Sequence, residues 1–126
     1  LVLLDAAAIT EVNEDFLQHQ GSTDVITFDY RDEPRLPAEE DVLAGEILVC
    51  LDVAREASVQ HETTFSEEVV LYCVHGMLHL AGLDDHCDTD RAEMRAAESR
   101  VMAALRNQYN LADLFAAPAI DLATRN

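Results

Sequence analysis

The sequence predicts an α+β domain: a small mixed β-sheet covered by helices, with a central buried helix that carries two histidines. Two observations point to this class. Short runs rich in β-branched and aromatic residues are mixed with longer segments whose apolar residues recur at helical spacing. In addition, the helical segment 66–80 is apolar on nearly every side, which is typical of a helix enclosed by other elements.

The first part of the chain predicts a strand, a helix and a second strand. Residues 2–4 form a short apolar strand, and Asp5 is placed to cap a helix over residues 6–19. The inward face of this helix carries apolar residues at helical spacing: Ile9, Val12 and Phe16. Gly21 ends the helix, and the β-branched and aromatic run at residues 25–30 predicts the next strand.

The middle of the chain predicts a loop and then the main helical region. Residues 31–43 contain two prolines and many charges, which indicates a loop, and residues 47–49 form the next strand. A helix follows over residues 52–61. Ser66 has the hydroxyl of a helix-capping residue and precedes two glutamates, so the central helix is predicted over residues 66–80. Gly82 stands where a helix ends in a left-handed residue.

The predicted domain ends with one more helix. It covers residues 89–108, and its inward face carries Met94, Val101, Met102 and Leu105. Residues 1–108 are therefore interpreted as a single domain, and residues 109–126 as a loosely attached C-terminal tail.

Charge excludes several classes of partner. The chain has 126 residues, a formal net charge of −17 and eight basic residues, all of them arginine. Such a chain does not bind DNA non-specifically or bind an anionic membrane, because both depend on many cations.

No apolar run reaches the roughly 18 residues that a transmembrane helix needs. Three cysteines without CxxC spacing predict free thiols and a reducing cytoplasmic location.

Three of the five histidines lie close together in the sequence. His75 and His79 are four residues apart, so their rings lie on one face of the central helix, and His86 follows Gly82. A single buried histidine is commonly a hydrogen-bonded structural residue, and a pair at this spacing also arises by chance. Three on one helix and its exit loop favour a metal ion. Three imidazoles around one Zn²⁺ leave a fourth position for water, as in catalytic zinc sites.

The segment from His75 to His86 (HGMLHLAGLDDH) resembles the signature of the YbeY family (UPF0054) of single-strand-specific endoribonucleases. Upstream, Asn13, Phe16 and residues 23–28 (TDVITF) are similar to further family segments, as are residues 44–47 (AGEI). The resemblance implies an α+β fold, one zinc ion held by three histidines, and action in 16S rRNA 3′-end maturation and ribosome quality control. It also implies that a first strand and helix of the family are missing from this N-terminus.

The chain departs from the family pattern in three places. The family has five residues between its second and third histidines, whereas six separate His79 from His86, and Asp85 takes the usual position. Either His86 reaches the metal through a one-residue bulge, which we favour here, or Asp85 is the ligand. The other departures are Leu17 and His19, which stand where the family often has an arginine and a lysine.

The predicted function is that of a zinc-dependent endoribonuclease with His75, His79 and His86 as metal ligands. Asp85 is the candidate general base, and substrate-binding residues are not assigned. The expected partners are single-stranded rRNA, the small ribosomal subunit and ribosome-associated proteins. Two alternatives remain: a metalloprotease-like hydrolase, although Gly76 stands where such enzymes need a glutamate, and a non-catalytic ribosome-associated adaptor with a structural metal.

Overall fold

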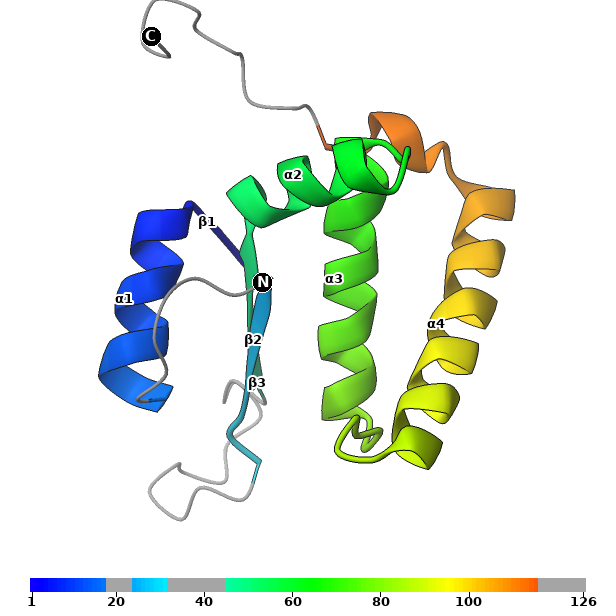
Figure 1. Cartoon of the computed structure of the whole chain (residues 1–126). Helices are drawn as coiled ribbons and strands as arrows, with labels where there is room; N and C mark the ends of the chain where they lie inside the picture. Colours follow the sequence, from blue (N-terminus) through cyan, green and yellow to red (C-terminus); the bar gives the residue numbers. More distant parts are fainter. Residues whose placement is uncertain (18–23, 32–44, 116–126) are drawn as a thin grey trace, which may run out of the picture.

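The fold consists of packed layers of helices and one small sheet. The computed structural model describes residues 1–17, 24–31 and 45–115. Within them the elements follow in the order β1 (Val2–Leu4), α1 (Ala6–Leu17), β2 (Val25–Asp29), β3 (Gly45–Cys50), α2 (Leu51–Gln60), α3 (Phe65–Leu80), α4 (Asp88–Gln108) and the 3₁₀ helix η1 (Leu111–Asp113). The sheet lies between α1 and α3, and α4 covers the far side of α3 (Figure 1). The predicted α+β class with a central helix is confirmed.

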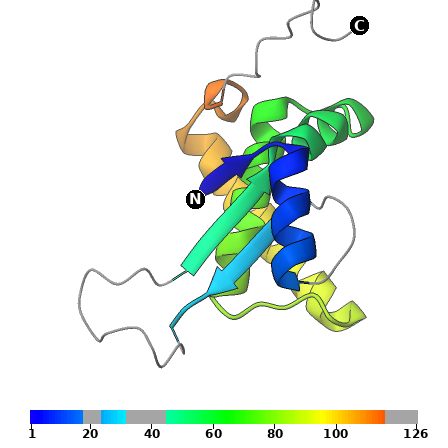
Figure 2. The same ribbon diagram turned by 90° about the vertical axis from the view of Figure 1, so that its left-hand side faces the viewer.

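The sheet is mixed, with β3 in its centre. β1 pairs with β3 in parallel, so that Val2 lies opposite Leu48, and β2 pairs with β3 antiparallel. Figure 2 shows the three strands side by side, with α1 on the near face of the sheet. The near face packs Ile26, Leu48 and Cys50 against Ile9 of α1. The opposite face packs Ile47 and Val49 against α3, as the side-chain alternation of a strand requires.

The start of α3 differs from its prediction. The N-cap is Thr64, whose hydroxyl accepts a hydrogen bond from the backbone N–H of Glu67 at 3.1 Å. Ser66, which was predicted to cap the helix, is 1% exposed instead, and its Oγ accepts a hydrogen bond from the backbone N–H of Phe115 at 2.9 Å. Ser66 thus joins α3 to the end of the described chain.

The packed part of the chain extends past the predicted domain end at residue 108. Leu111 in η1 is 2% exposed and packs with Val70, Val74 and Met102 between α3 and α4. The first residues of the predicted tail are therefore part of the core. Residues 116–126 lie outside the described residues, as does the predicted loop at 31–43 apart from Arg31.

Two of the three cysteines lie in the interior of the domain. Cys50 and Cys73 are buried free thiols, and burial raises the pKa of both. In the part of the chain that the structure describes, no helix combines the length and apolar character needed to cross a bilayer.

Gly76 sets the distance between α3 and β3. A Cβ at this position would lie 2.7 Å from Cγ2 of Ile47 on the neighbouring strand. We expect Gly76→Ala to lower the free energy of unfolding by about 1–2 kcal/mol. A contact of 2.7 Å is too short for a real Cβ, so the overpacking cost falls in the upper part of its range, at about 2–3 kcal/mol, and the better helix propensity of alanine offsets about 1 kcal/mol. Urea unfolding measures this change. Met77→Ala, at an exposed neighbouring position, is the control, and equal stability of the two variants would contradict the packing argument.

Candidate metal centre

The last two turns of α3 carry two imidazoles on the same face. His75 and His79 are one helical turn apart, and their rings meet edge to face with centroids 4.6 Å apart. Their Nε2 atoms are separated by 3.1 Å. Both side chains are 23% exposed, so the pair lies at the surface end of a buried helix rather than inside the core. The predicted pairing of these two histidines is present in the structure.

The turn after α3 brings a carboxylate to the same point. Gly82 has φ of +109°, a conformation that favours glycine, and its backbone N–H donates to the carbonyl of His79 at 3.0 Å. The N–H of Leu83 donates to the carbonyl of Leu78 at 3.0 Å, and the chain then reverses. As a result, Oδ2 of Asp85 lies 3.6 Å from Nε2 of both histidines.

The three donor atoms have a spacing that suits a divalent cation. All of them lie within 4.8 Å of one another, and their separations are 3.1, 3.6 and 3.6 Å. Ligands at about 2.0–2.1 Å from a tetrahedral zinc ion are about 3.3–3.4 Å from each other. The residues present therefore fit a metal ion with two nitrogen ligands and one oxygen ligand, a donor set that leaves a coordination position for water or substrate.

Further carboxylates face the other ring nitrogens. Oε1 of Glu98, on α4, lies 2.5 Å from Nδ1 of His75, and Oδ1 of Asp84 lies 4.0 Å from Nδ1 of His79. A proton on Nδ1 of His75 that is shared with Glu98 leaves the lone pair on Nε2, directed at the donor group. This is the arrangement that fixes the tautomer and orientation of metal-binding histidines.

Comparison of this sequence with known protein families and with individual proteins identifies its family. A family model described as endoribonuclease YbeY matches residues 1–106. This chain belongs to the YbeY family. It is 38% identical over 95 residues to the endoribonuclease YbeY of Phocaeicola vulgatus, covering 75% of this chain and 64% of that protein. It is 36% identical over 102 residues to that of Porphyromonas gingivalis, covering 81% and 63%.

A solved structure agrees with this assignment. The solution structure of TM1509 from Thermotoga maritima matches with a TM-score of 0.58 and 30% identity, over 84% of this chain and 66% of that one. The chain spans just under two thirds of the length of the two relatives from P. vulgatus and P. gingivalis.

His86 lies outside the donor group of this YbeY-family chain. Its side chain is 80% exposed, and its Nε2 lies 3.8 Å from Oδ1 of Asp84. The structure thus places the imidazole that we favoured as the third ligand outside this group, and brings the carboxylate of Asp85, the alternative ligand, to 3.6 Å from both imidazoles. Asp85 was expected either as a general base or as this alternative ligand, and it lies in the donor group.

Three other residues lie beside the site and were given no role from the sequence. Glu98, Arg91 and Arg95 all lie on α4 and line a cavity of about 170 Å³ together with His75, Asp85 and Met94. The inward position of Glu98 was detectable, because it follows Met94 by four residues and precedes Met102 by four on the predicted apolar face.

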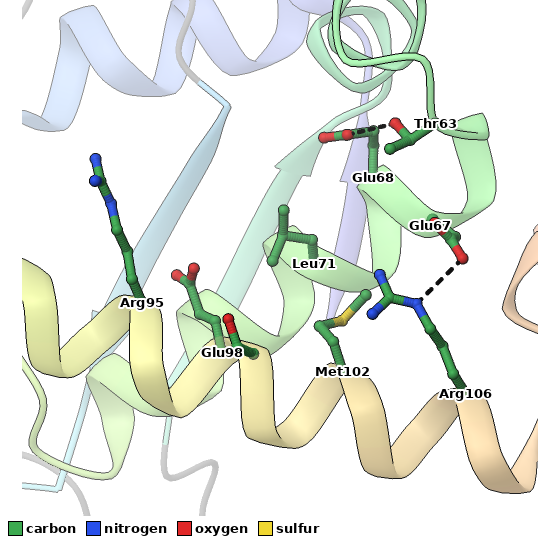
Figure 3. A pocket seen from close by; sticks show the side chains of 9 residues that line it. Thr63, Glu67, Glu68, Leu71, Arg95, Glu98, Met102 and Arg106 are labelled. Atoms are coloured by element: carbon green, nitrogen blue, oxygen red, sulfur yellow. Dashed lines mark hydrogen bonds and ion pairs between the residues drawn. The ribbon is translucent and has the colours of Figure 1, made fainter.

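A second, larger cavity adjoins the first along α3 and α4. It has a volume of about 360 Å³ and shares Arg95 and Glu98 with the cavity of about 170 Å³ beside the donor group. Figure 3 shows the cavity between the two helices. The side chains on the α4 side include Arg95, Glu98, Met102 and Arg106, and those on the α3 side are Glu67, Glu68 and Leu71. Burial raises the pKa of the nearby Tyr72, and the charge of Glu68 raises it further.

Proposed function

We propose that this chain is a metal-dependent endoribonuclease that cleaves single-stranded ribosomal RNA. The observation that carries the proposal is the group formed by His75, His79 and Asp85, which lies beside a cavity at the end of α3. Membership of a family whose model is described as endoribonuclease supports RNA as the substrate. The relatives from P. vulgatus and P. gingivalis carry the same description.

We propose one zinc ion as the cofactor, with Nε2 of His75, Nε2 of His79 and Oδ2 of Asp85 as its ligands. When bound, a zinc ion supplies a Lewis acid that polarises a phosphoryl oxygen and lowers the pKa of a bound water. Glu98 holds the ring of His75 in place through Nδ1. Asp85, as a ligand, is then not the free general base that its place in the sequence suggested.

The finer role follows from the resemblance of the motif at residues 75–86. We propose that the chain acts in the cytoplasm on the small ribosomal subunit, in 16S rRNA 3′-end maturation and ribosome quality control, in contact with ribosome-associated proteins. A net charge of −17 repels nucleic acid as a whole, so binding must depend on a few local cationic contacts.

Peptide hydrolysis is the weaker candidate because of how α3 packs. The residue after His75 is Gly76, which lies against Ile47 of β3 and has no carboxylate to act as the base of a metalloprotease. An adaptor with a purely structural metal is also less favoured, since structural zinc sites are closed by four protein ligands and this group contributes three.

The test compares cleavage with and without metal. We expect the purified chain with one equivalent of zinc to cleave a labelled single-stranded 16S rRNA 3′-end fragment, and a matching duplex to be cut far more slowly. A chelator is expected to abolish cleavage and added zinc to restore it, whereas His79→Ala is expected to stay inactive at every zinc concentration. If the zinc-loaded chain leaves the RNA intact, the proposed activity is wrong.

A further inference from the structure

Two arginines on α4 face the cavity beside the metal ligands. Arg91 and Arg95 are one helical turn apart, and both line the cavity of about 170 Å³ that also contains His75 and Asp85. An arginine presents a planar fork of N–H donors that matches the oxygens of a phosphate. The pair is therefore placed where a phosphodiester next to the metal group would lie.

Both guanidinium groups are available to a ligand. Among the residues that the structure describes, none forms a hydrogen bond or ion pair with Arg95. Arg91 pairs with Asp88, whose side chain is 97% exposed, and donates to the carbonyl of Asp85 at 3.3 Å. An ion pair as exposed as this one contributes little, so Arg91 can exchange Asp88 for another anion at small cost.

The charge around the cavity favours an anion once the metal is bound. Like charges four residues apart on a helix repel one another, and an anion between Arg91 and Arg95 relieves this repulsion. Among the side chains that line the cavity, a bound divalent cation and the two guanidinium groups outweigh the carboxylates of Asp85 and Glu98, and an anion at Arg91 would take the place of the exposed Asp88. The lining of the cavity is then cationic on a chain whose net charge is −17.

The adjoining cavity leaves room for the rest of a nucleotide. Arg95 lines both the metal cavity and the cavity of about 360 Å³ between α3 and α4. In Figure 3, Arg95 stands at one end of this cavity and the apolar side chains of Leu71 and Met102 lie further along it. A phosphate bound at Arg95 can therefore continue into a nucleoside that lies along the groove.

We propose that Arg91 and Arg95 bind a phosphate of the RNA strand next to the metal ligands and so provide the substrate contacts of this chain. The inference rests on the proposed endoribonuclease function and assigns its phosphate-binding residues. It also accounts for how a strongly acidic protein holds a polyanion at one point of its surface.

Binding of a single-stranded 2′-O-methyl RNA oligomer tests the inference separately from cleavage. The variants are Arg91→Gln, Arg95→Gln and the double variant of the zinc-loaded chain. Arg100→Gln is the matched control, because Arg100 lies on the same helix, is exposed and lines neither of the two cavities. Fluorescence anisotropy is measured over a series of salt concentrations, and zinc stoichiometry is measured for every variant.

Each single variant is expected to raise the Kd about tenfold, since a charge-assisted contact to phosphate is lost. The slope of log Kd against log salt is expected to become shallower by about 0.7 for each arginine removed. Arg100→Gln is expected to stay within about twofold of the parent chain.

Two results would overturn the inference alone. One is that the Arg91 and Arg95 variants bind like Arg100→Gln while the parent chain still cleaves RNA, in which case the endoribonuclease function stands without these contacts. The other is a loss of zinc from the variants that accounts for their weaker binding, which would make the arginines structural. A parent chain that neither binds nor cleaves RNA would remove the proposed function and the inference together.

Discussion

Replacing Asp85 with alanine is expected to weaken zinc binding about a hundredfold, because a zinc site with four ligands distributes about 10–16 kcal/mol over its bonds, or about 3 kcal/mol for each ligand. Replacing His86 with alanine is expected to change the Kd by less than about twofold. The reason is geometric: Oδ2 of Asp85 lies 3.6 Å from both ring nitrogens, whereas the side chain of His86 is 80% exposed outside the donor group.

Competition with a chromophoric zinc chelator measures these constants. His79→Ala is the reference for the loss of one ligand, because both assignments of the third ligand include His79. Circular dichroism checks that each variant is folded. A large loss of affinity in His86→Ala together with a small loss in Asp85→Ala would reverse the assignment and restore the site with three imidazoles.

The pairing of the two histidines of α3 was predictable from the sequence, but the third member of the proposed donor group was not. Residues four apart on a helix must share a face, so His75 and His79 follow from helical periodicity alone. The choice between Asp85 and His86 depends on how tightly the chain reverses after Gly82. That reversal is set by the positive φ of Gly82 and its hydrogen bonds, which local patterns do not define to within one residue.

The fold shows the same division between local and distant effects. The strands and helices follow from apolar periodicity, and their order along the chain is confirmed. Ser66 was assigned to the wrong role because its partner, the backbone N–H of Phe115, is 49 residues away. Leu111 was placed in a loose tail for the same reason, since its burial depends on α3 and α4 meeting in space.

Glu98 is the residue whose role had a signal in the sequence. It lies on the face of α4 that also carries Met94 and Met102, so a carboxylate stands among side chains that point inward. A buried or half-buried carboxylate needs a partner, and an antiparallel neighbouring helix with histidines is the nearest source. The structure supplies that partner as Nδ1 of His75.

Replacing Glu98 with alanine is therefore expected to weaken zinc binding about 10–100-fold, the usual effect of removing a group that orients a metal-binding histidine. Without Glu98, the ring of His75 can rotate, and the proton can move to Nε2, where it blocks the lone pair that the metal needs. Glu98→Gln is expected to lose less, because the amide oxygen still accepts a hydrogen bond from Nδ1 but carries no charge.

The same chelator competition measures both variants, and Glu93→Ala is the matched control, since Glu93 lies on α4 and is exposed to solvent. Glu93→Ala makes the same change in charge without touching either histidine, so a long-range electrostatic effect of α4 would appear in both alanine variants. If Glu98→Ala binds zinc no more weakly than Glu93→Ala, Glu98 acts on the site only through its charge, and the positioning role assigned to it is wrong. If the order is Glu98→Ala weakest, then Glu98→Gln, then Glu93→Ala, orientation of the His75 ring is what α4 contributes to the metal centre.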